Sequence, residues 1–293
     1  MKKIEYIERQ TGRIRVENPP GESYLKFLYH NPLGSLPLNL VVKRKLLSAF
    51  YGWLMKRKNS CRKIAPFVKQ YGIDAQEALD PLKQYKSFND FFIRKLKPSA
   101  RPIQQGVTSP ADGKILAFQN MDDIASFFVK GDKFTLEKFL RSKKLAYEYS
   151  NAAIIIVRLA PNDYHRFHFP YQGKASAPCR INGSCFSVSP YAVNWNFTRV
   201  FCENKRHYSL LKTADKGTIL ISPVGATMIG SIVETYVPES EVAKGDEMGY
   251  FSFGGSSILM LIDRGKVTID ADILKNTANG LETTVRMGET IGH

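Results

Sequence analysis

Apolar residues are spaced differently in the first hundred residues and in the rest of the chain. Between residues 36 and 58, large apolar side chains recur at intervals of three and four residues, which predicts an amphipathic helix. Shorter helical patterns follow at residues 64–71 and 75–82. An aromatic cluster in residues 88–102 ends in two prolines, which break such patterns. We therefore expect a helical N-terminal region that ends near residue 105.

From residue 109 onward, short apolar runs alternate with Gly, Pro and Asn, which is typical of strands joined by turns. The clearest runs are residues 152–159, 217–222 and 226–233. Residues 242–249 and 285–292 share the pattern V-x-x-G-[DE]-x-[MI]-G, and such repeated turns resemble barrel-sandwich-hybrid folds, as in biotinyl and lipoyl domains. The pattern thus predicts an α+β protein in which residues 1–105 are helical. Residues 106–293 would form a mainly antiparallel, barrel-sandwich-hybrid-like body.

The formal net charge of +15 changes this picture, because it is concentrated at one end of the chain. Residues 1–101 contain 21 Lys and Arg against 8 Asp and Glu. Such an excess indicates an anionic partner, either nucleic acid or a membrane surface. The predicted helix suits an anionic lipid interface, although a core helix with a solvated basic edge fits the same pattern. The basic residues that bracket its apolar stretch are Lys43, Arg44, Lys45, Lys56, Arg57 and Lys58.

Two further observations limit the class of protein. No stretch approaches the ~20 apolar residues of a membrane span, and the charged start is followed by no apolar segment of a signal peptide. The four cysteines have no C-x-x-C spacing, so neither zinc nor a redox pair is indicated. We expect reduced thiols in a protein that faces the cytosol and does not cross the membrane.

Three segments could carry chemistry. In residues 254–257 (Gly-Gly-Ser-Ser), two glycines allow backbone conformations that a Cβ forbids, so a serine hydroxyl can approach the preceding carbonyl. Asp112 precedes a glycine in a predicted turn, where it either accepts a hydrogen bond or caps its own backbone. His165 and His168 suit proton transfer, but they could also pack among the flanking aromatic rings. No nearby Glu or Cys completes a ligand set with them, so no metal is predicted.

A serine needs a base before it becomes a nucleophile, and a histidine oriented by a carboxylate is the usual base. Asp112, His168 and Ser256 supply these three parts. A serine hydrolase would use the same residue types, so the residues alone leave the reaction open.

Five motifs, in their order and spacing, resemble the phosphatidylserine decarboxylase family. The resemblance covers about residues 30 to 290. The chain departs from the family at the cleavage motif, which is often L-G-S-T and here is G-G-S-S, but the Gly255–Ser256 pair is kept. The motifs are F-F-I-R-K-L-K-P-x-x-R-P at 91–102, S-P-A-D-G-K at 109–114, D-Y-H-R-F-H-F-P at 163–170, V-G-A-T-M-I-G-S at 224–231 and K-G-D-E-M-G-Y-F-x-F-G-G-S-S at 244–257.

The resemblance implies a self-cleaving enzyme with a pyruvoyl group derived from Ser256. His168, oriented by Asp112, would take the proton of Ser256, whose oxygen attacks the Gly255 carbonyl. Elimination would leave a β chain of residues 1–255 and an α chain of residues 256–293 that begins with the pyruvoyl group. Phosphatidylserine would form a Schiff base with this group and lose carbon dioxide, and His165 would return the proton to give phosphatidylethanolamine.

The resemblance also implies the partners and the location. It implies phosphatidylserine and an anionic membrane surface, with the α and β chains paired as a heterodimer; it leaves open a homodimer of these heterodimers and implies no nucleic acid. The protein would be peripheral on the cytoplasmic face of the cell membrane. A serine hydrolase would instead remain one chain, a biotinyl or lipoyl carrier would need a hairpin lysine that is absent, and a non-catalytic membrane-surface binding module would leave the Gly-Ser step unexplained.

Overall fold

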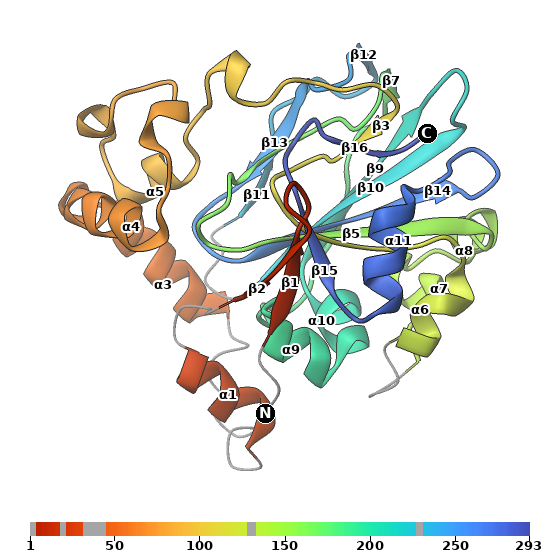
Figure 1. Cartoon of the computed structure of the whole chain (residues 1–293), viewed down its shortest axis with the longest axis horizontal. Coiled ribbons are helices and arrows are strands. Elements are labelled where there is room, and N and C mark those ends of the chain that lie inside the picture. The colour runs from red at the N-terminus through yellow and green to blue at the C-terminus, as the bar shows by residue number, and fades with distance from the viewer. Residues whose placement is uncertain (1–3, 18–21, 32–44, 128–132, 227–230) are drawn as a thin grey trace.

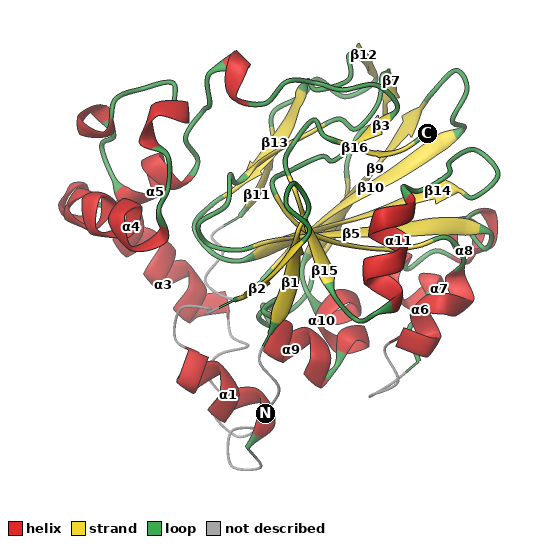
Figure 2. Ribbon diagram, viewed as in Figure 1, coloured by secondary structure: helices red, strands yellow, loops and turns green. Residues whose placement is uncertain are grey.

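A computed structural model describes residues 4–17, 22–31, 45–127, 133–226 and 231–293. Its helices lie around a central set of strands (Figures 1 and 2). The helices are α1 (Glu22–His30), α3 (Lys45–Lys56), α4 (Ile64–Tyr71), α5 (Phe88–Phe92), α6 (Met121–Phe127), α7 (Leu136–Leu140), α8 (Lys143–Glu148), α9 (Pro190–Trp195), α10 (Phe197–Glu203) and α11 (Ala271–Ala278).

The strands fall into one large and two small sheets. The large sheet has eleven strands in the order β12-β7-β9-β10-β14-β5-β4-β15-β1-β2, with β8 also paired to β9. The small sheets are β11-β13-β6 and β16-β3. The strands are β1 (Glu5–Glu8), β2 (Arg13–Val16), β3 (Val107–Thr108), β4 (Gly113–Phe118), β5 (Ala152–Leu159), β6 (Arg166–His168), β7 (Gly173–Ala175), β8 (Cys179–Ile181), β9 (Arg206–Lys212), β10 (Thr218–Gly225), β11 (Ile232–Glu234), β12 (Ser240–Val242), β13 (Glu247–Phe251), β14 (Ser256–Asp263), β15 (Glu282–Val285) and β16 (Thr290–Gly292).

The strand order confirms an α+β fold with a mainly antiparallel sheet. Among the described strands, only the pair β1 and β15 is parallel. The large sheet runs as an open path from β12 to β2, and within the described residues it does not close into a barrel. The barrel-sandwich-hybrid arrangement that we expected from the repeated turns is therefore not confirmed.

The large sheet is covered on both faces. In β5, Ile154 and Ile156 face a core that includes side chains of α7, α9 and α10, while Ile155 and Val157 face a second core with α11 and the small sheets. Strands buried on both sides read as continuous apolar runs, which explains why β5 and β14 show no polar alternation. Figure 1 shows β14 running through the middle of the molecule, with α11 in front of the strands.

A third core lies in the N-terminal helical region, beside the sheet (Figure 1). It joins α3, α4 and α5 through Met55, Ile64, Phe88, Phe91 and Phe92, which are at most 4% exposed. Helix α4 matches the predicted segment 64–71, and α3 forms the part of the predicted helix at 36–58 that runs from Lys45 to Lys56, where it ends before a 3₁₀ helix at Lys58–Lys63. Residues 32–44, which include Lys43 and Arg44, lie outside the described residues.

The helix predicted at residues 75–82 is wrong. The chain forms two separate 3₁₀ turns there, at Ala75–Glu77 and Leu82–Gln84. Pro81 has no N–H to donate to a helix, and between the turns Ala78 pairs with Leu96 in an isolated β-bridge. In addition, strands β1 and β2 precede the helices and extend the large sheet, so the N-terminal region contributes strands as well as helices.

Candidate active site

Ser256 is the first residue of β14, between β10 and β5. It pairs with Gly225 on one side and with Leu159 on the other. The residue is completely buried, and its Oγ has no hydrogen-bond partner among the described residues. Just before it, Gly254 has φ of 142°, a conformation that strains any residue with a Cβ. The Gly255–Ser256 bond thus joins a glycine turn to a strand that is buried at every position except its last residue.

His165 lies beside this turn with one basic nitrogen free. Its ring packs on Phe92, with 3.9 Å between the centroids. Nδ1 lies 2.8 Å from the carbonyl oxygen of Asp163, and since a carbonyl only accepts, Nδ1 carries the hydrogen and Nε2 keeps its lone pair. Nε2 is buried without a partner in the described part of the chain. Burial lowers the pKa of His165 to about 3, aided by the charge of Arg94 and against raising effects from the backbones of Asp163 and Gly254.

His168, on β6, has both ring nitrogens occupied. Nδ1 lies 2.9 Å from the carbonyl oxygen of Gly245, and Nε2 lies 3.2 Å from the hydroxyl of Tyr164. The same reasoning places the hydrogen on Nδ1, so that Nε2 accepts from Tyr164. Burial lowers the pKa of His168. Both histidines are therefore neutral near pH 7.

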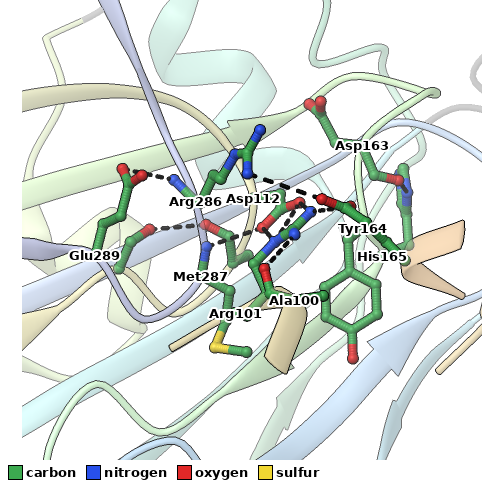
Figure 3. A network of polar contacts seen from close by, with 12 residues as sticks. Ala100, Arg101, Asp112, Asp163, Tyr164, His165, Arg286, Met287 and Glu289 are labelled. Carbon is green, nitrogen blue, oxygen red and sulfur yellow. Dashed lines mark hydrogen bonds and ion pairs between the residues drawn. The ribbon is translucent and has the colours of Figure 1, made fainter. Parts of the chain in front are cut away.

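Asp112 is held by an arginine and a backbone amide rather than by a histidine (Figure 3). Arg101 donates to both carboxylate oxygens, at 2.9 Å from Nε to Oδ1 and 2.6 Å from the terminal nitrogen to Oδ2. The amide of Met287 donates to Oδ1 at 2.9 Å. No hydrogen bond joins Asp112 to His168 in the described structure. The two segments are nevertheless adjacent, because the amide of His168 donates to the Pro110 carbonyl at 2.8 Å.

The two sequence repeats form matching turns. Gly245 and Gly288 occupy the same place in each repeat, with φ of 89° and 86°. A Cβ on either glycine would collide with Ile103, at 2.8 and 2.9 Å. The next residue closes each turn: Asp246 accepts from the amide three residues earlier at 2.7 Å, and Glu289 does the same at 3.0 Å.

Each of these turns holds one side chain of the site. The carbonyl of Gly245 in the first turn accepts from His168, and the amide of Met287 in the second donates to Asp112. The repeat V-x-x-G-[DE]-x-[MI]-G is visible in the sequence, but its role in placing these two residues is not.

Helix α5 holds the residues just before the Gly255–Ser256 bond. The side-chain oxygen of Asn89 accepts from the amide of Phe253 at 3.0 Å. Phe92 packs edge-on against Phe253, with 4.9 Å between centroids, as well as on His165. Sequence reasoning missed Asn89 and also missed the partners Tyr164 and Arg101. Tyr164 and Arg101 lie inside two of the five family motifs, at 163–170 and 91–102, and this is the sequence signal that could have identified them as site residues.

The described part of α3 has two apolar sides. Met55 is buried in the N-terminal core, whereas Phe50 and Trp53 are 58% and 48% exposed and stack on each other. Lys56, Arg57 and Lys58 are exposed, and Arg57 lies over the Trp53 ring at 3.8 Å; the side chain of Lys45 is not described. Among the described residues, no helix is long and apolar enough to cross a membrane, and no three His, Cys, Asp or Glu side chains form a metal-binding group.

Comparison with known proteins gives full-length similarity to one family. A sequence model described as phosphatidylserine decarboxylase matches residues 88–293. A phosphatidylserine decarboxylase proenzyme of Fusobacterium nucleatum is 52% identical over 99% of this chain and 98% of its own length. Proteins of the same name from Desulfitobacterium hafniense and Chlamydia trachomatis are each 43% identical, over 99% and 98% of this chain and over 98% and 96% of their own lengths.

Proposed function

The chain belongs to the phosphatidylserine decarboxylase family, and from this premise we propose how it works. It is a carboxy-lyase that decarboxylates phosphatidylserine to phosphatidylethanolamine. It is made as a proenzyme and cuts itself between Gly255 and Ser256. The products are a β chain of residues 1–255 and an α chain of residues 256–293, which stay together as a heterodimer. The proposed division at residue 105 separates a membrane-docking region from the catalytic body.

Self-cleavage begins with the hydroxyl of Ser256. His168 takes its proton once Nε2 leaves the Tyr164 hydroxyl, and the charge of Asp112 favours the protonated imidazole. The serine oxygen then attacks the Gly255 carbonyl carbon. The C–N bond breaks, which leaves an ester to Gly255 and a free amine on residue 256. Loss of the α proton then breaks the Cβ–O bond and releases Gly255 as a carboxylate. Water replaces the nitrogen of residue 256, ammonia leaves, and a pyruvoyl group remains at the start of the α chain.

The residues around Ser256 suit such a group. A pyruvoyl ketone condenses with an amine and accepts electrons as a neighbouring carboxylate is lost. His165 is the proposed proton carrier to the product: its neutral, unpartnered Nε2 takes up a proton from solvent and passes it to the product carbon, and its ring packs beside Gly254 and Phe92. Phe92 and Phe253, which are closely packed, limit water near that nitrogen. A positioned proton donor typically contributes ~10²–10⁴ in rate.

One observation carries the proposal: of the two fully buried serine hydroxyls without a partner among the described residues, only that of Ser256 directly follows the glycine pair, in which Gly254 has a φ of 142° that glycine alone adopts without strain. Buried polar groups are nearly always hydrogen-bonded, so an exception indicates a role in chemistry. A serine hydrolase would need this hydroxyl open to a substrate, whereas Ser256 is 0% exposed. Attack on the adjoining peptide bond needs no access from outside.

Ser256→Ala is expected to abolish cleavage, because no oxygen remains to attack Gly255. Ser257→Ala is the matched control, since Ser257 is equally buried and its hydroxyl is also unpartnered. Mass spectrometry of wild type and of Ser257→Ala should give two fragments that meet between residues 255 and 256, the smaller with a blocked, ketone-containing N-terminus. A wild-type chain that stays intact but reacts at Ser256 with a fluorophosphonate would instead indicate a hydrolase.

The enzyme must take its substrate from a bilayer, because each methylene exposed to water costs ~0.8 kcal/mol. The exposed aromatic pair and basic end of α3 support docking on an anionic membrane. We place the enzyme peripherally on the cytoplasmic face of the cell membrane, where cations near anionic lipid contribute about 1 kcal/mol each. The proposed assembly there is a homodimer of heterodimers.

Removal of the basic docking residues is expected to weaken binding to phosphatidylserine vesicles by more than about a hundredfold, given about 1 kcal/mol per cation. Vesicle sedimentation measures the effect. Unchanged binding would exclude residues 36–58 as the docking element. The residues to change to Ser are Lys43, Arg44, Lys45, Lys56, Arg57 and Lys58. A control variant removes three lysines that are exposed on the β body, Lys212, Lys266 and Lys275.

A further inference from the structure

Arg94 is a buried cation without an anionic partner. It follows α5 and is only 6% exposed. Its guanidinium lies over the ring of Phe91, at 4.8 Å from the centroid. Among the described residues, its side chain has neither a hydrogen bond nor an ion pair. A buried charge normally requires such a partner, because the cost of leaving water is high.

The other buried arginines are fully paired. Arg101 binds Asp112 and Glu77, and Arg158 binds Glu17 and Glu282. Arg206 donates to four backbone carbonyls, of Lys138, Phe139, Cys202 and Asn204. The fold therefore pairs its structural arginines, and Arg94 is the exception within the described part of the chain.

Arg94 also lies at the catalytic site. It is two residues after Phe92, which packs on His165. Burial lowers the pKa of Arg94, and Asp112 and Tyr164 lie close enough to raise it; Arg94 in turn lowers the pKa of His165. The carboxylate of Asp112 is already held by Arg101 and Met287. The guanidinium nitrogens of Arg94 are unpartnered in the described structure but keep some accessible surface. The completely enclosed unpartnered side-chain atoms of the described residues belong instead to Tyr85, His165, His207, Ser256 and Ser257.

We propose that Arg94 binds the phosphodiester of the phospholipid head group. This rests on the proposed function and adds to it the residue that anchors the substrate anion. A planar guanidinium pairs with two phosphate oxygens at once. The substrate carboxylate is the poorer match, because its charge disappears as carbon dioxide leaves. An ion pair to it would stabilise the starting state more than the transition state. The phosphodiester keeps its charge throughout.

The test uses purified, processed enzyme and soluble dihexanoyl lipids. Arg94→Gln is expected to cleave itself normally. Its KM for dihexanoylphosphatidylserine should rise about tenfold to a hundredfold, because the loss of a hydrogen bond to a charged group weakens binding by about that factor. The inhibition constant of dihexanoylphosphatidylethanolamine, which has the phosphodiester but no carboxylate, should rise by the same factor. Lys95→Gln is the control, because Lys95 is exposed in the same segment and also loses a charge.

Three results would overturn the proposal. The first is an unchanged KM and inhibition constant in Arg94→Gln. The second is a raised KM with an unchanged inhibition constant, which would assign Arg94 to the carboxylate. If Arg94→Gln fails to process, Arg94→Lys is measured instead, with a smaller rise expected in both constants; unchanged constants in that variant would make Arg94 a structural cation. Inactive wild-type enzyme would count against the proposed function and not against Arg94 alone.

Discussion

At the scale of single residues, burial determines the protonation of the two histidines. It lowers the pKa of His165 to about 3 and also lowers that of His168. A base works only above its own pKa, so a lowered pKa extends the neutral form to lower pH. An exposed histidine would be half protonated near its ordinary pKa of about 6.5.

The rate of self-cleavage, measured from pH 8 to pH 6, is therefore expected to fall to half only at a pH below 6.5. Freshly translated proenzyme can be followed on denaturing gels across this range, with Ser256→Ala as the uncleaved control. A rate that falls to half near pH 6.5 would mean that the base has an ordinary, solvated pKa.

The sequence predicts the residue types of the proposed site, but not the contacts that these residues make. Ser256, His168 and Asp112 were selected because cleavage needs a nucleophile, a base and a carboxylate. The sequence does not show that Asp112 pairs with Arg101, or that the Tyr164 hydroxyl donates to Nε2 of His168, since each contact depends on how the folded chain packs. Nor does it show that His165 Nε2 is the basic nitrogen left free.

At the scale of elements, α5 acts as a support for the segment that is cut. Asn89→Ala removes the acceptor for the Phe253 amide, and a misplaced reacting bond loses rate. We expect self-cleavage about tenfold slower, measured as fragment formation over time, with an almost unchanged melting temperature. Asn89→Asp keeps an acceptor and should recover most of the rate. If Asn89→Ala cleaves as fast as wild type, α5 does not position the bond.

Elements with strong local patterns were predictable, and their arrangement was not. The apolar run 152–159 is β5, and the segment 64–71 is α4. Each could be predicted because the spacing of its own apolar residues indicates its secondary structure. The order β10-β14-β5 joins segments far apart in sequence, and no local pattern encodes that pairing. Likewise, a local turn pattern could not distinguish an open sheet from a barrel-sandwich hybrid.

At the scale of the whole molecule, the two proposed chains are interlocked. Strand β15 lies between β4 and β1, and β16 pairs with β3. Arg158 on β5 binds Glu17 from the N-terminal region and Glu282 from β15, with ion-pair distances of 2.6 and 2.5 Å. The segments before and after the cleavage point are therefore held by the same sheet.

Glu17→Gln is expected to destabilise the protein at pH 7 by about 3 kcal/mol, because it leaves Arg158 with one partner fewer. Burial raises the pKa of Glu17, but Arg158 and Lys114 outweigh it and lower the pKa to about 2, from an ordinary value of 4.5. The difference in the free energy of unfolding between wild type and Glu17→Gln should therefore be full above pH 4.5 and disappear as the pH falls towards 2. Urea unfolding at several pH values measures this.

Glu8→Gln is the matched control, because Glu8 pairs with Arg15 at the exposed edge of the sheet. Exposed pairs contribute little to stability, so this variant should unfold like wild type. Equal stability of Glu17→Gln and Glu8→Gln at pH 7 would show that the buried cluster is not stabilising.

Ser256 begins the central strand of the sheet, and in the proposed mechanism this position limits the working life of each molecule. A reactive group built from that residue cannot diffuse away, be exchanged or be loaded again from a cellular pool. Each polypeptide thus has one opportunity to become active, and chemical damage to the group inactivates that molecule permanently. The supply of active enzyme then depends on new protein synthesis rather than on the supply of a dissociable cofactor.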